Sequence, residues 1–313
     1  MSIFDDKNIK PMLLGEIDKP FDSSDYIFEL KLDGIRCLMY LDQNETQMRN
    51  KRNLNVNNIY PELKDINKNV KERCILDGEI IIMNEGRPDF YNLQRRAHMG
   101  NNLKIELAAS KYPATFTAFD ILYYKDKDIS KLKLEERKEI LSDIVTENER
   151  IAVSRFIPEK GIYLYNAALK LDLEGIVAKK KGSLYYFDKR SKDWLKIKNL
   201  KDEDFVICGY IQKEHNIVSL ILGLYDENYE LVYQGHVTTG VSSEDFKMIL
   251  KVPEVKHSPF ISIQENKGAH FIAPILVCTV KYMMRTAGGG LRQPVFKGIR
   301  LDKEAFECRI KKY

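Results

Sequence analysis

Short apolar runs alternate with charged residues through the first two-thirds of the chain. Six runs rich in β-branched and aromatic residues predict strands at residues 26–32, 36–42, 45–50, 74–83, 114–124 and 174–180. Apolar residues at helical spacing predict helices at 133–145 and 162–171, and a third at 89–97 that Asp89 would cap. Strands and helices do not alternate regularly, so the pattern favours an α+β fold with mainly antiparallel sheets.

The pattern changes after residue 199. Five short runs separated by turn residues predict strands at 204–211, 216–226, 229–237, 274–282 and 306–312, and residues 242–250 predict one helix. This set fits a small β-barrel of the OB-fold type, although periodicity alone equally allows a small sandwich. We therefore expect two domains, 1–199 and 200–313, with the boundary in a charged segment near Asn199 and Leu200.

The composition is that of a globular protein. Of 313 residues, 44% are apolar and 31% charged, which excludes wholesale disorder. No apolar run reaches the length of a membrane span and the N-terminus lacks a signal-peptide core, so we expect no membrane association. The five cysteines are scattered without a CxxC pair, which indicates reduced thiols in a cytoplasm rather than a zinc site or disulfides.

Charge is distributed unevenly along the chain. The net charge of +4, from 50 basic and 46 acidic residues, says little by itself. Residues 179–201, "KKKGSLYYFDKRSKDWLKIKNLK", are however strongly basic and contain several aromatic residues. Such a stretch suits a phosphate-rich partner, although any single lysine in it is more often part of a solvated surface.

Lys31 lies in the apolar stretch "FELKLDGIRCLMY". An amine attacks phosphorus only when neutral, and both burial and nearby cations lower the pKa of a lysine. The segment supplies such a setting, because Gly34 allows a turn that brings Arg36 back toward the same place. Taken alone, the pattern KxDGxR fits a surface lysine on an edge strand equally well.

The sequence "KLDGIR" resembles motif I of the covalent nucleotidyltransferases, which include DNA ligases, RNA ligases and mRNA capping enzymes. Further elements follow in that family's order: "MRN" with Arg49, "LDGEI" with Glu79, "FTAFDILYY" with Phe119, "EGIVAKK" with Glu174, "DWLKIK" with Lys196 and Lys198, and "LRQPVFKGIRLDK" with Arg300, Asp302 and Lys303. The resemblance covers essentially the whole chain. It is strongest to the ATP-dependent DNA ligases, particularly the ligase domain of bacterial ligase D type enzymes.

The resemblance implies a fold and a role for each matching residue. The fold would be an antiparallel-sheet nucleotidyltransferase domain, of the ATP-grasp-like adenylation type, followed by an OB-fold domain. Lys31 would be the catalytic nucleophile, Glu29 would lie at the adenine, and Phe119 would stack on it. The implied phosphate ligands are Arg36, Arg190, Lys196, Lys198 and Arg300, and the implied metal ligands are Glu174 and Glu79, the latter with a ribose contact as the alternative. Arg49 would contact the sugar or the adenylated end, with Arg52 as the alternative.

The residues are consistent with such chemistry. The chain has no GxxxxGK[ST] loop, so cations rather than a backbone nest would have to neutralise a triphosphate. Lys196 and Lys198 are two positions apart, so both would face the same side of one strand. Transfer of a nucleotidyl group depends chiefly on positioning and charge stabilisation, which a ring of cations and a metal ion provides.

The resemblance implies an ATP-dependent DNA ligase that joins 3′-hydroxyl and 5′-phosphate ends through a lysine–AMP intermediate. It further implies ATP and Mg²⁺ as cofactors, with Mn²⁺ as a substitute, and nicked or broken duplex DNA as substrate. By analogy we also expect a monomeric, cytoplasmic protein that acts in DNA repair, with Ku as a partner. RNA ligase and mRNA capping guanylyltransferase remain alternatives that would use the same lysine.

Overall fold

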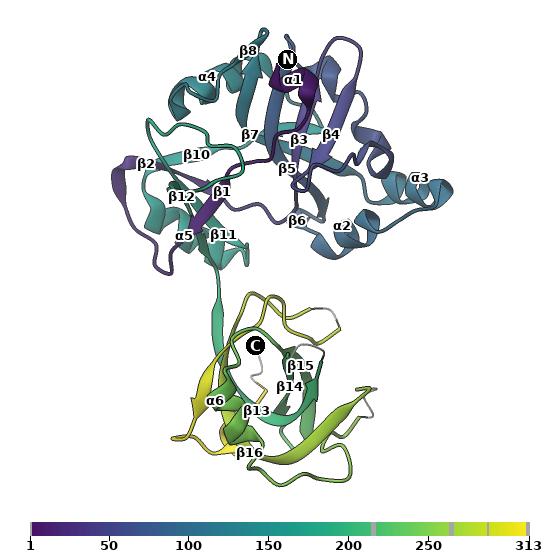
Figure 1. The fold of residues 1–313 in the computed structure, drawn as a ribbon, viewed down its shortest axis with the longest axis vertical. Helices are drawn as coiled ribbons and strands as arrows, with labels where there is room; N and C mark the ends of the chain where they lie inside the picture. Colours follow the sequence, from purple (N-terminus) through teal and green to yellow (C-terminus); the bar gives the residue numbers. More distant parts are fainter. Residues whose placement is uncertain (1, 214–216, 263–265, 287, 311–313) are drawn as a thin grey trace. The chain divides into compact units, whose positions relative to one another are not determined.

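The computed structural model describes residues 2–213, 217–262, 266–286 and 288–310. The chain divides into two compact units, Met1–Asn199 and Leu200–Tyr313 (Figure 1). Each unit has its own hydrophobic core. In the part of the chain that the structure describes, no helix is long and apolar enough to cross a membrane.

The first unit contains two sheets. The larger has the strand order β4–β3–β5–β7–β8, with β6 pairing with β5 and β9 pairing with β7. Its strands are β3 (Ile35–Leu41), β4 (Thr46–Asn50), β5 (Cys74–Asn84), β6 (Arg87–Pro88), β7 (Ala114–Tyr124), β8 (Lys127–Asp128) and β9 (Ile151–Val153). All of its pairings are antiparallel except that of β7 with β9.

The smaller sheet of this unit has the order β1–β12–β11–β2–β10. Its strands are β1 (Leu13–Glu16), β2 (Ser23–Leu30), β10 (Phe156–Glu159), β11 (Gly175–Lys180) and β12 (Arg190–Lys198). Only β1 and β12 run parallel. Strand β2 ends at Leu30, so the prediction that it extends to residue 32 was wrong, and Lys31 lies just beyond the strand end.

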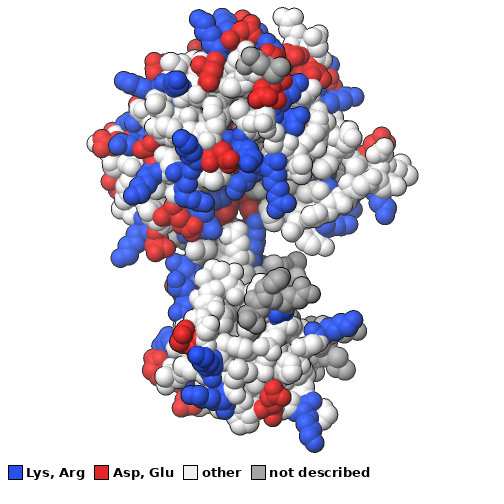
Figure 2. All heavy atoms as spheres, viewed as in Figure 1, with Lys and Arg blue, Asp and Glu red and all other residues white. Residues whose placement is uncertain are grey.

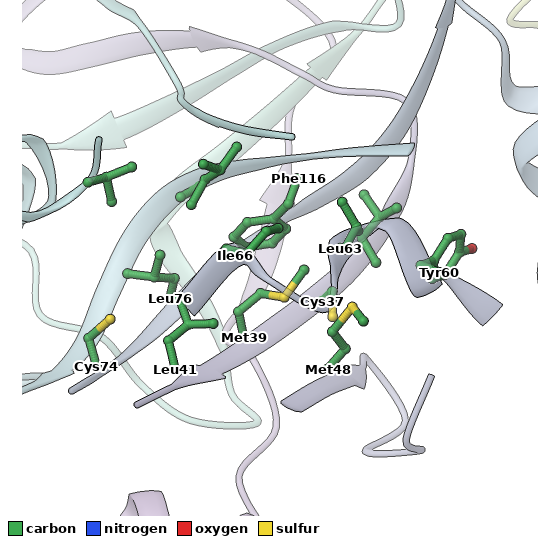
Figure 3. Packing of buried hydrophobic residues seen from close by; sticks show 14 of the residues in the cluster. Cys37, Met39, Leu41, Met48, Tyr60, Leu63, Ile66, Cys74, Leu76 and Phe116 are labelled. Carbon is green, nitrogen blue, oxygen red and sulfur yellow. The ribbon is translucent and has the colours of Figure 1, made fainter. Parts of the chain in front are cut away.

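The interior strand β3 is apolar because both of its faces are buried. Cys37, Met39 and Leu41 belong to one hydrophobic cluster, whereas Leu38 and Tyr40 belong to another. This alternation follows from the two-residue period of a strand. Figure 3 shows the first cluster, in which β3 packs with side chains of β4, β5, β7 and the segment around residues 60–66. The larger sheet is therefore packed on both faces along β3, which ends the turn that follows Lys31.

The helices of the first unit are α1 (Ile3–Asp6), α2 (Phe90–Ala97), α3 (Asn102–Lys111), α4 (Leu134–Ile144) and α5 (Gly161–Lys170). The three predicted helices correspond to α2, α4 and α5. Asp89 caps α2 as predicted, since its side chain accepts a hydrogen bond of 2.9 Å from the backbone N–H of Asn92. The pattern did not predict α1 or α3.

The second unit is a curved sheet of order β15–β14–β13–β16–β17. Its elements are β13 (Lys201–Gln212), β14 (Val218–Tyr225), β15 (Leu231–Val237), α6 (Ser243–Ile249), β16 (Ala269–Tyr282) and β17 (Val295–Arg300). The two edges approach each other just beyond β15, where Thr239 forms a bridge with Val295 and accepts a backbone hydrogen bond of 2.9 Å from Phe296. The sheet thus forms a partly closed barrel.

The fifth strand of this barrel is not the predicted one. We expected a strand at 306–312, but Ala305–Glu307 form a 3-10 helix, and residues 311–313 lie outside the described part. Arg309 makes only an isolated bridge to Tyr225. The fifth strand is instead β17, which contains part of the segment matched to the last family motif.

All five cysteines are free and buried: Cys37, Cys74, Cys208, Cys278 and Cys308. None is more than 2% exposed. Burial also raises the pKa of each of these thiols, which favours the unreactive protonated form.

Candidate active site

The first unit contains a cavity of about 1000 Å³. Strands of both sheets contribute to its walls, which are rich in cations. Of the predicted site residues, Glu29, Lys31, Arg36, Glu79, Phe119, Arg190 and Lys196 line it. In Figure 2, Lys and Arg side chains gather around a hollow in the visible face of this unit. A smaller cavity, of about 290 Å³, is lined by residues of the second unit.

Lys31 lines this cavity and contacts Glu174, which lies behind the lining residues and 143 positions away in the sequence. The Nζ of Lys31 donates a hydrogen bond of 2.6 Å to Oε2 of Glu174. The backbone supports this pair, because the N–H of Lys31 donates to the carbonyl of Gly175, at 2.9 Å. Their side chains are 19% and 5% exposed, so the lysine can be reached from the cavity while the carboxylate is nearly enclosed.

The turn after Lys31 packs tightly on the larger sheet. A Cβ added to Gly34 would lie 2.3 Å from the carbonyl oxygen of Ile80, so only glycine fits at this close approach. The turn returns Arg36 to the cavity, as predicted. Its guanidinium, however, is engaged by buried Asp77 through two hydrogen bonds, from Nε (2.7 Å) and Nη2 (2.6 Å).

Asp77 and Tyr185 were not predicted as part of the site. The hydroxyl of Tyr185 donates a hydrogen bond of 2.6 Å to Asp77, which therefore has three donors together with the two from Arg36. Burial opposes the charge on Arg36, but Asp77 outweighs it and holds the pKa of the guanidinium above its ordinary value. Arg36 is consequently a fixed cation, which Asp77 holds at the wall of the cavity.

Glu79 also lines the cavity, and the surrounding protein opposes its ionisation. Burial raises its pKa from 4.5 to about 8, and the neighbouring cations Arg36 and Lys31 offset only part of this effect. Glu79 is therefore a neutral carboxylic acid near pH 7. A cation bound beside it would favour loss of its proton.

Lys196 and Lys198 project from β12, two residues apart, as predicted. Both pair with Glu16 of β1, at 2.9 Å and 3.8 Å respectively. Arg190, at the start of β12, donates to the backbone carbonyl of Leu14. Glu16 had no predicted role. Through it, β1 supplies the carboxylate that pairs with the lysines of β12.

Glu29 lines the cavity and is nearly buried, with 2% of its surface exposed. Two lysines that the sequence analysis did not single out bind it: Lys138 from α4, and Lys179 from β11, whose Nζ lies 3.0 Å away. Burial opposes ionisation of Glu29, but the two lysines outweigh it and hold its pKa below the ordinary value. Lys179 belongs to the basic stretch 179–201, yet it points inward and is only 2% exposed.

Phe119 is nearly buried, with 9% of its surface exposed, and its edge meets Trp194. The Cζ of Arg36 and the Nζ of Lys179 each lie 4.6 Å from the centre of its ring. The ring thus lines the cavity among cations, where its electron-rich faces are favourable.

The structure separates the two candidate arginines after Lys31. Arg52 lines the cavity, whereas Arg49 is not among its lining residues. Arg49 donates through Nη1 to the backbone carbonyl of Asn53, at 2.9 Å, and its buried Nε has no hydrogen-bond partner. Arg49 therefore supports the loop on which Arg52 is exposed.

Arg300 lies on β17 of the second unit, at the smaller cavity. Asp204 collects the cations of this segment, since its Oδ2 accepts from Lys303 at 2.8 Å and from Arg300 at 3.4 Å. Thr279 donates to the other oxygen at 2.6 Å, and Arg300 also pairs with Asp302 at 2.8 Å. Asp204 had no predicted role, but it organises this basic cluster.

The carboxylates near Lys31 fit a magnesium ion that phosphate oxygens help to bind. Among the described residues, no group of three or more His, Cys, Asp or Glu side chains could hold a metal by itself. Glu174 and Glu79 are close enough for each to influence the other's ionisation. Mg²⁺ is usually bound by one or two carboxylates together with substrate phosphates, so this pair meets the requirement.

The sequence and the structure of this chain are similar to those of known proteins. The family model described as ATP dependent DNA ligase domain matches residues 11–198, and that described as ATP dependent DNA ligase C terminal region matches residues 213–303. The multifunctional non-homologous end joining protein LigD of Pseudomonas aeruginosa is 31% identical over 96% of this chain. The SPbeta prophage-derived DNA ligase-like protein LigB of Bacillus subtilis is 30% identical over 94% of it.

A solved structure, mycobacterial DNA ligase D complexed with ATP and MES, is also similar. It is 26% identical, with a TM-score of 0.57, and the match covers 97% of this chain and 99% of that one. The lengths of the sequence relatives differ: this chain spans 36% of the Pseudomonas protein but 99% of the Bacillus protein.

Proposed function

This chain belongs to the ATP-dependent DNA ligases, and we propose that it joins 3′-hydroxyl and 5′-phosphate ends of duplex DNA through a covalent lysine–AMP intermediate. The observation that carries this proposal is the position of Lys31. Its amine lies at a cation-lined cavity, within 2.6 Å of the carboxylate of Glu174. In this proposal the first unit is the adenylation domain and the second is the OB-fold domain.

Lys31 must lose a proton to solvent before it can attack, because only the neutral amine is a nucleophile. Its Nζ donates to Oε2 of Glu174 at 2.6 Å, and this contact would orient the amine toward the α-phosphorus. The amine then forms a P–N bond to the α-phosphorus of ATP while the bond to the β-phosphate oxygen breaks. Pyrophosphate leaves, and loss of the remaining proton gives the lysine–AMP phosphoramidate.

Lys196, Lys198 and Arg190 would receive the phosphates of ATP. Lys196 and Lys198 pair with the half-exposed Glu16. A phosphate of ATP could displace Glu16 and form stronger ion pairs with both lysines. Burial, and the proximity of Lys196, lower the pKa of Lys198. An anionic phosphate would restore the preference of Lys198 for its charged form.

Glu174 and Glu79 would hold Mg²⁺, and Mn²⁺ in its place, together with phosphate oxygens. A bound Mg²⁺ supplies positive charge that offsets the charge developing on the phosphates. The role of Glu79 depends on loss of its proton, which its raised pKa opposes near pH 7.

Two further transfers would complete the reaction. AMP passes from Lys31 to the 5′-phosphate of the break, and the 3′-hydroxyl then displaces AMP to form the phosphodiester. We further propose a monomer that acts in DNA repair, since the Pseudomonas relative is named for non-homologous end joining. Ku is a proposed partner by analogy alone, and the five free cysteines favour a cytoplasmic location.

Incubation with labelled ATP tests the first step, and sealing of nicked DNA tests the whole reaction. Lys31→Ala is expected to abolish both, whereas Lys127→Ala, on exposed β8, is expected to leave both intact. Parallel assays with GTP and NAD⁺, and with nicked RNA, separate this proposal from the alternatives. An adduct with GTP only would indicate a capping guanylyltransferase, and sealing of RNA only would indicate an RNA ligase.

A further inference from the structure

Asn199 is a buried polar residue at the end of the first unit. It is only 4% exposed, and the next residue, Leu200, begins the second unit. Its side-chain Nδ2 donates a hydrogen bond of 3.1 Å to the carbonyl of Leu173, and its backbone N–H donates one of 2.9 Å to the carbonyl of Glu174. One residue therefore binds two successive carbonyls of the segment that carries the Glu174 carboxylate, and nothing in the reaction described above uses it.

The segment that Asn199 binds also contacts Lys31. The next carbonyl along it, that of Gly175, accepts a hydrogen bond of 2.9 Å from the backbone N–H of Lys31. Gly175 is held closely against β12, because a Cβ added to it would lie 2.1 Å from the carbonyl oxygen of Ile197. Its φ of +134° is also in the region that favours glycine. The carbonyls of residues 173, 174 and 175 are thus bound in turn by Asn199, Asn199 and Lys31.

A small shift of this segment would reach the reacting amine. The carboxylate of Glu174 projects from the segment, and its Oε2 lies 2.6 Å from the Nζ of Lys31. Displacement of a reacting group by about 1 Å can slow a reaction about a hundredfold. Loss of the Asn199 side chain allows a smaller shift, because its backbone N–H would still hold Glu174, so we expect an effect of about tenfold.

We infer that Asn199 is a positioning residue, which fixes the backbone of residues 173–174 and so holds the Glu174 carboxylate against the amine of Lys31. The inference rests on the proposed function, because it needs Lys31 to be the nucleophile that Glu174 orients. Asn199 does not line the cavity, so it acts through Glu174 and not on the nucleotide. Because Asn199 is the last residue of the first unit, the carboxylate is fixed before the chain passes into the second.

The test is the single-turnover formation of the protein–AMP adduct from labelled ATP, without DNA, using the full chain. Pyrophosphate first removes any AMP already bound to the protein, by reversal of the same step. In Asn199→Ala the maximal rate constant is expected to fall about tenfold, while the half-saturating ATP concentration and the final amount of adduct per protein stay those of wild type. Asn166 is an exposed asparagine on α5, so Asn166→Ala is the matched control and should leave all three quantities unchanged.

Each of the three quantities can contradict the inference. An unchanged rate constant in Asn199→Ala would overturn it. A smaller amount of adduct formed at the wild-type rate would also overturn it, because that result indicates partial unfolding and not a displaced carboxylate. A raised half-saturating ATP concentration at the wild-type rate would place the effect on the lysines of β12 that would receive the phosphates, and would likewise overturn the inference.

Circular dichroism establishes whether each variant is folded. Should Asn199→Ala not fold, Asn199→Ser decides, because its hydroxyl extends one bond less than the amide and does not reach the carbonyl of Leu173. The same fall in the rate constant is expected for this variant, and the wild-type rate would overturn the inference. A wild-type protein that forms no adduct with ATP would instead refute the proposed function.

Discussion

Glu79 offers a quantitative test of the electrostatics of the cavity. Burial raises its pKa from 4.5 to about 8, so the folded protein holds it as a neutral acid over a pH range in which the unfolded chain ionises it. The folded state therefore binds more protons than the unfolded state in this range. The contribution of the Glu79 proton to the free energy of unfolding is therefore fully present below pH 4.5 and is lost as the pH rises through 8.

The size of the effect follows from the shift. Each pH unit between the two pKa values changes the free energy of unfolding by about 1.4 kcal/mol. Between about pH 5 and about pH 8.5, ionisation of Glu79 should therefore cost the fold roughly 4 kcal/mol. Glu79→Gln cannot ionise, so its free energy of unfolding should rise relative to wild type by this amount over the interval.

Trp194 makes the measurement specific to the unit that contains Glu79. It is the single tryptophan of the chain, and it is fully buried in the first unit. Urea unfolding followed by its fluorescence, without nucleotide or divalent cation, therefore reports this unit even when the second unfolds separately. The comparison of wild type with Glu79→Gln at each pH cancels the titration of other groups.

The control is Glu139→Gln, which alters an exposed carboxylate on α4 and should show the same difference from wild type at both pH values. A difference between wild type and Glu79→Gln that stays constant within about 0.5 kcal/mol would refute the reasoning. It would mean that Glu79 is solvated, or that its cationic neighbours stabilise the carboxylate fully.

Three further predictions concern other contacts. Asp120→Asn should lower the free energy of unfolding by about 3–5 kcal/mol in urea, because Asp120 and Arg137 are both fully buried and the change leaves the arginine without a counter-charge. Glu16→Gln should lower the KM for ATP about threefold with kcat unchanged, since the phosphates no longer compete for Lys196; a raised KM would contradict this. Phe119→Leu should raise the KM for ATP roughly tenfold through lost stacking, whereas an unchanged KM would place the base elsewhere.

Much of the fold could be predicted because local patterns determine it. The alternation along β3 and the cap on α2 are short-range signals, and the expected α+β class with a following OB-fold is confirmed. The expected last strand failed because "FECRI" has strand periodicity but pairs with β14 only through one isolated bridge, from Arg309 to Tyr225. Phe306 and Ile310 remain 55% and 43% exposed, and only Cys308 is buried.

The site was predictable where a motif carries it, and not where it depends on long-range pairing. The sequence motifs led to Lys31 and Glu174, but only the fold shows that they meet. Asp77, Lys138 and Lys179 escaped notice because a buried charge is recognised by its partner. These partners lie between 41 and 150 residues away in the sequence, where no local spacing identifies them. The roles of the site residues remain predictions that the variants above would test.

The burial of all five cysteines makes this protein a convenient object for chemical labelling. Thiol-reactive dyes need an accessible thiolate, and each native thiol is enclosed in a core with a raised pKa. One cysteine introduced at an exposed position in each unit could therefore be labelled without first removing the native ones. Energy transfer between two such dyes would follow the separation of the two units as nucleotide and DNA are added.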